Sequence, residues 1–350
     1  MEQTKRENWI DSLKLIAMLI VVMNHAGCIV PGFSFWGGMF YVPVFFVLSG
    51  YTCHSKEESL KKTVGKKAKR LLVPYFTANL FLLGFFFIKD VLLTRMKTVW
   101  QGLSAIFGIL YGRNRIFSFA QETLLHPAAQ ETYPLMTILN APTWFLPALF
   151  LTILLYEAAA RFLARDEKKI WLLAMILLCF AVCYHYLTPL LLPWSLDAVA
   201  FFFLLYLTGI AVRKHNLLGW ADAHKWILPA CIILLALSGL YNGSANLSIG
   251  DYGRSVMLAL VNAASSSLLM MYLLWKGKKY IPAVLGMAGR QTLFLLCYHM
   301  LVLEILKTLI PGIPLFVRVV LAMALLAGIG VGKDAMMAAR KERRGRHAER

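Results

Sequence analysis

The sequence has few charged residues for its length. Only 15% of its 350 residues are Asp, Glu, Lys or Arg, whereas 59% are hydrophobic. A soluble domain of this size has no place to bury so much apolar surface, so the composition excludes most water-soluble proteins. The apolar residues lie in blocks of roughly 18 or more, the length that a helix needs to cross a hydrocarbon core of about 30 Å. The composition therefore predicts a polytopic membrane protein.

Other absences narrow the class further. The apolar runs lack alternation with a period of two, which argues against a β-barrel. No internal repeat is visible, which argues against transporter folds built from duplicated halves. The six cysteines fall in or beside the apolar blocks without the spacing of a zinc site, so we expect no metal. No small-residue cleavage site follows the first apolar block, which we therefore expect to be a transmembrane helix.

These features predict an all-α bundle of about ten transmembrane spans. We expect residues 1–333 to form one membrane domain and residues 334–350 to form a basic cytoplasmic tail. The predicted spans lie near residues 13–30, 39–54, 75–93, 142–160, 170–188, 197–212, 226–241, 255–275, 291–308 and 316–332.

Acidic residues are scarce, and the formal net charge is +18. With ten spans, 28 of the 36 Lys and Arg residues fall on one side of the membrane and 8 on the other. This bias predicts that both termini are cytoplasmic. It explains the basicity without nucleic acid as a partner, although the tail itself has two interpretations, a solvated segment or one that contacts anionic lipid heads. We expect a multi-pass protein of a cell membrane.

The first apolar block carries unusual polar residues. The segment "DSLKLIAMLIVVMNH" holds Asp11, Lys14 and His25. On a helix, the eleven residues from Lys14 to His25 bring the two side chains to within about 20° of one face, with about 16 Å of rise between them. Ionisable residues within a span usually face the bundle interior or a water-filled cavity, where they mark a site or a pathway.

Lys14 and Asp11 also have simpler interpretations. Lys14 is placed to extend toward the inner interface as an anchor. Asp11 suits a helix N-cap with Lys14 as its partner. His25 lies deep in the span, where a lone histidine is costly without a role, so it is our candidate catalytic residue.

Several further features are ambiguous. His299 is a second histidine within a span, and Glu304, five residues later, lies on another helix face. Asp197 opens the sixth span, where an N-cap role is expected. The outer segment 94–141 contains a stretch, 99–112, that suits a re-entrant or interfacial helix better than a span.

Taken together, the motifs resemble those of acyltransferase family 3 membrane proteins. The first span of that family carries a basic residue, ten spacer residues and then a histidine, as Lys14 and His25 do. Further similar segments follow in order: "VPVFFVLSGY" (42–51), "KRLLVPY" (69–75), "APTWFLPALF" (141–150) and "AGRQTLFLLCYH" (288–299). Within that family, the motifs are most similar to those of the fucose 4-O-acetylase-like branch. The sequence departs from the family at Lys14, where arginine is more common.

The resemblance implies a membrane O-acyltransferase that uses cytoplasmic acyl-CoA, with acetyl-CoA as the expected donor. His25 would act as a general base on an acceptor hydroxyl or carry the acyl group briefly. The CoA phosphates would meet Lys14, Lys69 and Arg70. The acceptor would be a cell-surface carbohydrate or a related glycan. Candidate cavity residues are Asp11, Ser49, Tyr51, Trp144 and His299.

The sequence leaves alternatives open. Trp144 suits simple packing as well as a cavity wall, and Ser49-Gly50 suits close helix contact. The buried charges also suit a secondary transporter or a flippase of a polar or lipid-linked substrate, and a non-catalytic sensor is a third possibility.

Overall fold

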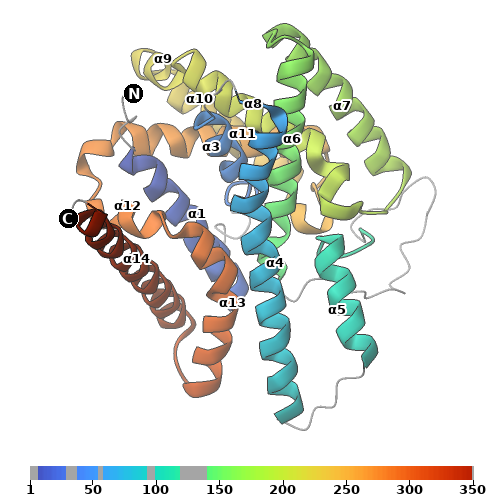
Figure 1. Ribbon diagram of the computed structural model, residues 1–350. Helices are drawn as coiled ribbons and strands as arrows, with labels where there is room; N and C mark the ends of the chain where they lie inside the picture. The colour runs from blue at the N-terminus through green and yellow to red at the C-terminus, as the bar shows by residue number, and fades with distance from the viewer. Residues whose placement is uncertain (1–6, 29–37, 54–57, 93–98, 119–139, 349–350) are drawn as a thin grey trace. The chain divides into compact units, whose positions relative to one another are not determined.

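The computed structural model describes residues 7–28, 38–53, 58–92, 99–118 and 140–348. These residues form a helical protein, which confirms the predicted fold class. Within these ranges the extended pairing amounts to isolated bridges and no strand is formed. Figure 1 labels the helices. The α-helices are α1 (Asn8–Ala26), α3 (Pro43–Tyr51), α4 (Leu60–Leu92), α5 (Val99–Tyr111), α6 (Phe145–Phe162), α7 (Glu167–Leu187), α8 (Val199–Lys214), α9 (Leu217–Ala223), α10 (Ile227–Asn242), α11 (Val256–Lys276), α12 (Ala283–Gly289), α13 (Thr292–Leu309) and α14 (Leu315–Ala348).

Short 3-10 helices supplement these elements. Two of them lead directly into α-helices, η1 into α6 and η2 into α8. Their bounds are η1 (Ala141–Trp144), η2 (Pro193–Ala198), η3 (Leu247–Ile249) and η4 (Lys278–Tyr280).

Each of the ten predicted spans contains a helix, but the helices differ in length. Among the described residues, eight segments are long and apolar enough to cross a membrane. A ninth is possible if α9 and α10, bent by 107° at their junction, form one broken span. The predicted span 39–54 contains only the nine residues of α3, fewer than a full crossing requires.

The first helix begins and ends earlier than the predicted span 13–30. It ends at Ala26 because Gly27 adopts a left-handed conformation with φ 76°. The backbone N–H groups of Gly27 and Cys28 then donate to the carbonyls of Asn24 and Met23, which closes the helix end. His25 therefore lies in the last turn of α1, whereas the sequence suggested an interior position.

The predicted span 75–93 is part of a longer helix. Helix α4 begins at Leu60 and continues through Pro74. A proline within a helix removes one backbone donor. In the turn after Pro74, the Thr77 hydroxyl donates to the Val73 carbonyl (2.8 Å). Lys69 and Arg70 therefore lie on α4, before Pro74.

The segment 99–112 is helical, as α5, in agreement with the sequence interpretation. The Tyr75 hydroxyl of α4 donates to the Ile109 carbonyl of α5 (2.6 Å). This bond is buried and joins the two helices. Residues 119–139 of the same outer segment lie outside the described residues.

The chain divides into two compact units. One contains residues 1–31 and 270–350, and the other contains residues 32–269. In the first unit, α1 packs on α12, α13 and α14 (Figure 1). The contact with α12 is very close, because a Cβ atom on Gly289 would lie 1.9 Å from the Asp11 carbonyl oxygen. Glycine at this position therefore lets the two backbones touch.

Helix α14 continues without a break past residue 333, where we predict that the membrane domain ends. Just beyond that point, the Gln291 side chain donates to the Asp334 carboxylate (2.6 Å). The boundary between residues 333 and 334 stays a prediction.

In the second unit, α3 and α8 form the most extensive helix contact. The rings of Phe46 and Phe202 stack with centroids 4.1 Å apart. A Cβ atom on Gly50 would lie 1.9 Å from the Tyr206 carbonyl oxygen, and one on Gly209 equally close to the Val47 carbonyl oxygen. The predicted role of Gly50 in close helix contact is confirmed.

We expect Gly50→Ala to lower the free energy of unfolding by about 1–3 kcal/mol, because the new methyl group forces two backbones apart. Thermal unfolding of the purified protein in detergent measures this change. The matched control is Gly84→Ala in α4, where nothing lies within 4 Å of the added Cβ. The control should keep or raise stability, by up to about 1 kcal/mol. Equal melting temperatures of Gly50→Ala and Gly84→Ala would contradict the close contact of α3 with α8.

Candidate active site

Helix α1 holds the polar residues that the sequence singled out. Since α1 is one continuous helix over Asn8–Ala26, Asp11, Lys14 and His25 follow the expected helical spacing. The Lys14 ammonium lies 3.2 Å from the Asp11 carboxylate, and their side chains are 25% and 4% exposed. Asp11 lies inside the first turn and is not the N-cap, which is Glu7. The predicted N-cap role is therefore wrong, but the predicted Lys14 partner is confirmed.

His25 contacts a second histidine. Its ring and that of His299, from α13, have centroids 5.5 Å apart and planes at 53°. His299 is fully buried, whereas His25 is exposed. The sequence identified both histidines but gave no reason to place them together. The structure thus brings a predicted catalytic residue next to a predicted cavity residue.

The imidazole of His299 is held by its own helix. Its Nδ1 lies 3.0 Å from both the Leu295 and the Leu296 carbonyl oxygens. Carbonyl oxygens only accept hydrogen bonds, so Nδ1 carries the hydrogen and donates it. This contact fixes the ring's orientation relative to α13.

The other predicted site residues belong to the unit of residues 32–269. Lys69 and Arg70 are exposed on α4, and Ser49 is half-buried on α3. The Tyr51 carbonyl accepts a hydrogen bond from the Arg213 guanidinium (3.2 Å), which also lies 5.9 Å from the centroid of the Tyr51 ring. These contacts anchor the end of α3, and the predicted roles of these residues in binding stay predictions.

Trp144 is buried at the junction of η1 and α6. Its ring packs at an angle against the Phe202 ring, with centroids 6.0 Å apart. The Arg113 guanidinium lies 5.7 Å from the centroid of the Trp144 ring, within the range of a cation–π contact. Trp144 therefore contributes to packing, and it also borders a buried polar network.

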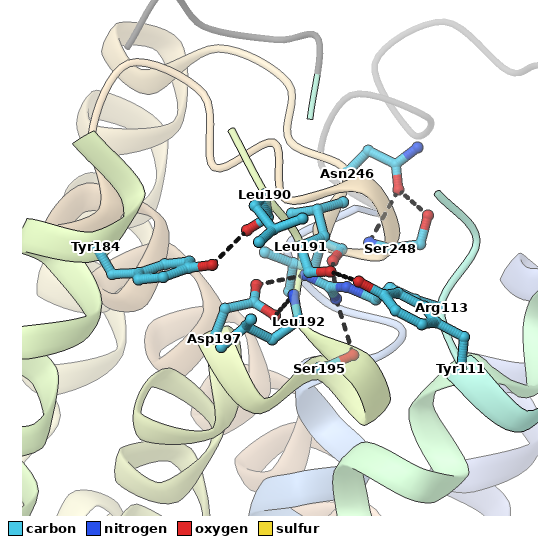
Figure 2. A network of polar contacts seen from close by, with 11 residues as sticks. Tyr111, Arg113, Tyr184, Leu190, Leu191, Leu192, Ser195, Asp197, Asn246 and Ser248 are labelled. Atoms are coloured by element: carbon cyan, nitrogen blue, oxygen red, sulfur yellow. Dashed lines mark hydrogen bonds and ion pairs between the residues drawn. The ribbon is translucent and has the colours of Figure 1, made fainter. Parts of the chain in front are cut away.

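This network centres on Arg113 (Figure 2). The fully buried guanidinium lies 2.6 Å from the Asp197 carboxylate and donates to the Ser195 hydroxyl (2.8 Å). The second Asp197 oxygen accepts from the Leu192 backbone N–H (3.0 Å). The network thus joins the segment after α5 to η2, which are distant in sequence.

The backbone next to this network is strained. Trp194 and Ser195 have φ values of 56° and 59°, in the left-handed region that costs a non-glycine residue energy. Ser195 is held there by Arg113, and Trp194 by a hydrogen bond from its indole N–H to the Leu110 carbonyl (2.8 Å). The surrounding contacts therefore impose the conformation.

A small cavity of about 20 Å³ adjoins the network. It has room for a single water molecule. Its polar lining includes Ser118, Tyr184, His185, Asp197 and Tyr252. Within the described ranges, no group of three or more His, Cys, Asp or Glu side chains is arranged to hold a metal ion. The expectation of no metal stays a prediction.

A comparison with protein families matches an acyltransferase domain to residues 7–332, nearly the whole chain. The chain belongs to acyltransferase family 3. Comparisons with curated proteins and with solved structures gave no match. The protein is thus an acyltransferase with the helices of a multi-pass membrane protein. The family resemblance of the motifs is confirmed, whereas the fucose 4-O-acetylase-like branch stays a prediction.

Sequence analysis of this acyltransferase missed the importance of Arg113. In the sequence, Arg113 is one of the eight Lys and Arg residues predicted on the outer side, and Asp197 is predicted only at a helix start. Eighty-four residues separate them, and nothing in the local pattern of either segment indicates their pairing. The one signal in the sequence is that each charge lies two residues from an apolar helix, Arg113 after α5 and Asp197 before α8.

We expect Arg113→Met to lower the free energy of unfolding by about 3–5 kcal/mol, because it leaves the Asp197 carboxylate buried without its cation. Thermal unfolding in detergent measures the loss. The double variant Arg113→Met/Asp197→Leu should recover much of it. The control is Lys214→Met, which breaks an exposed ion pair with Glu167 and should cost at most about 1 kcal/mol. An Arg113→Met protein as stable as the wild type would refute the role of the pair.

Proposed function

We propose that this acyltransferase moves an acetyl group from cytoplasmic acetyl-CoA to a hydroxyl of a cell-surface carbohydrate. Membership of acyltransferase family 3 supports acyl transfer in a membrane. The donor, the acceptor and the residue roles are our proposal. The observation that carries it is the contact of His25 with His299 in a membrane protein.

Paired imidazoles suit this chemistry. Ionisable side chains are costly inside a bilayer and usually mark a functional site. A neutral imidazole accepts a proton and returns it near neutral pH, as a general base requires. His25 has more exposed surface than His299, which is fully buried, so we assign contact with the substrate to His25.

In the reaction, His25 removes the proton of the acceptor hydroxyl while the hydroxyl oxygen attacks the thioester carbon. A new C–O ester bond forms and the C–S bond breaks. His25 then returns the proton to the departing thiolate of CoA, so no proton is gained or lost. In the alternative role, His25 itself accepts the acyl group and passes it to the acceptor.

Lys14 is proposed to bind the CoA phosphates. The Asp11 contact orients its ammonium, which stays partly exposed. Along α1, Lys14 and His25 are separated by about 16 Å of helical rise, which suits the extended pantetheine arm that links the CoA phosphates to the thioester. The proposed phosphate contacts of Lys69 and Arg70 rest on their positive charge and exposure on α4.

The remaining assignments follow from the family resemblance. They are acetyl as the acyl group, a glycan as the acceptor, the fucose 4-O-acetylase-like branch and the bacterial inner membrane. In this arrangement both termini and the donor lie on the cytoplasmic side, as the distribution of Lys and Arg predicts.

Radiolabelled acetyl-CoA tests the proposal in membrane vesicles from cells that produce the chain. We expect label to enter the glycan fraction as free CoA is released. His25→Ala should slow both the labelling of the glycan and the release of CoA by about 10²- to 10⁴-fold, because it removes the base. Lys14→Ala should raise KM for acetyl-CoA more than it lowers kcat, and Lys14→Arg should keep much of the activity.

The matched control is His224→Ala, which removes an exposed histidine at the end of α9. It should leave the rate unchanged. A His25→Ala protein with wild-type transfer would exclude His25 from catalysis. Movement of a substrate across the membrane without consumption of acetyl-CoA would favour a transporter or flippase instead.

A further inference from the structure

We infer that His299 is a positioning residue that selects the reactive tautomer of His25. This inference rests on the proposed function of His25 as a base. It is based on three features of His299: the hydrogen bond of its Nδ1, the buried and unsatisfied Nε2, and the ring contact with His25.

The first feature fixes where the proton of His299 lies. Nδ1 donates to the carbonyls of Leu295 and Leu296, each 3.0 Å away. A neutral imidazole carries one N–H and one lone pair. With the hydrogen held on Nδ1 by two backbone acceptors, the lone pair of the neutral ring lies on Nε2. The backbone of α13 thus makes His299 a hydrogen-bond acceptor at a fixed position.

The second feature is that this acceptor is buried and unused. Among the described residues, Nε2 of His299 has no hydrogen-bond partner, and the residue is fully buried. Buried polar atoms are nearly always satisfied, so an unsatisfied one calls for a specific explanation, such as a water molecule or a functional contact.

The third feature identifies the donor. The ring of His25 contacts that of His299, with centroids 5.5 Å apart. At this separation the two rings form a hydrogen bond after a small rotation of a side chain or through one bridging water. His25 lies in the last turn of α1, and its ring is more accessible than that of His299.

The consequence for His25 concerns its two nitrogens. When one His25 nitrogen donates its hydrogen toward Nε2 of His299, the other nitrogen holds the lone pair. That second nitrogen is the base that removes the hydroxyl proton of the acceptor. As His25 becomes protonated, its N–H toward His299 remains in place, so the ring keeps its orientation while the proton moves on to the CoA thiolate. The arrangement resembles the orienting carboxylate of a hydrolase triad, with a neutral imidazole in its place.

Two substitutions separate this role from simple packing. His299→Leu fills a similar volume but offers no acceptor, whereas His299→Gln offers an amide oxygen near the position of Nε2. We expect His299→Leu to lower kcat about 10- to 100-fold, the scale seen when the partner that orients a metal-bound histidine is removed. KM for acetyl-CoA should change little, and His299→Gln should recover most of the rate. Equal losses in both variants, or none in His299→Leu, would overturn the inference.

A substrate-free measurement makes the inference independent of the acyl-transfer assay. Solid-state NMR of protein with ¹⁵N-labelled histidine in lipid reports the tautomer of His25, assigned by comparison with His25→Gln. We expect one dominant tautomer in the wild type and in His299→Gln, and a mixture in His299→Leu. A mixture in the wild type would overturn the inference even if His299→Leu fails to fold. A single tautomer in vesicles that transfer no acetyl group would instead refute the proposed function and retain the positioning role.

Discussion

A polar side chain inside a hydrocarbon core needs a partner within the protein, because lipid offers neither hydrogen bonds nor solvation. A buried polar group in the interior of a protein has the same need, and three pairs of this chain meet it. In one unit, Lys14 pairs with Asp11, and Gln291 of the α12–α13 junction pairs with Asp334 of α14. In the other, Arg113 pairs with Asp197. Each pair satisfies a charge or an amide that helix packing shields at least in part from solvent.

The histidine pair meets this requirement only in part. Nδ1 of His299 is satisfied by its own helix, but Nε2 is buried without a partner among the described residues. Its neighbour His25 lies in the last turn of α1, two residues before the glycine that ends this helix. A helix end makes an imidazole accessible more readily than a helix centre does, which suits a base that must reach a substrate. Gly27 therefore contributes to the proposed site, because it ends α1 just after His25.

Much of this architecture could be predicted from hydropathy, since long apolar runs specify membrane helices almost directly. The shared helix face of Lys14 and His25 was predictable as well, because both lie on the one continuous helix α1. The ends of helices were less predictable. Gly27 ends α1 through a left-handed cap, whereas Pro74 lies within α4 although proline often marks a helix start. The nine-residue α3 lies within a longer apolar run whose hydropathy predicts a full transmembrane span.

Contacts between distant segments could not be predicted from the sequence. Nothing near His25 indicates that His299 contacts it, because 274 residues separate them and each helix is regular. The same holds for Arg113 and Asp197, which meet only once α5 and η2 are folded. Local patterns specify helices and faces, but the choice of partner depends on how the helices pack.

The central claim is that the acyl group reacts beside the histidine pair of α1 and α13. The most direct test is photolabelling with a CoA thioester whose short acyl chain carries a diazirine, followed by mass spectrometry of the peptides. The account predicts label in residues 8–26 and 292–309, reduced by excess acetyl-CoA. Label that acetyl-CoA displaces only from other helices, such as residues 60–92 or 199–214, would contradict it.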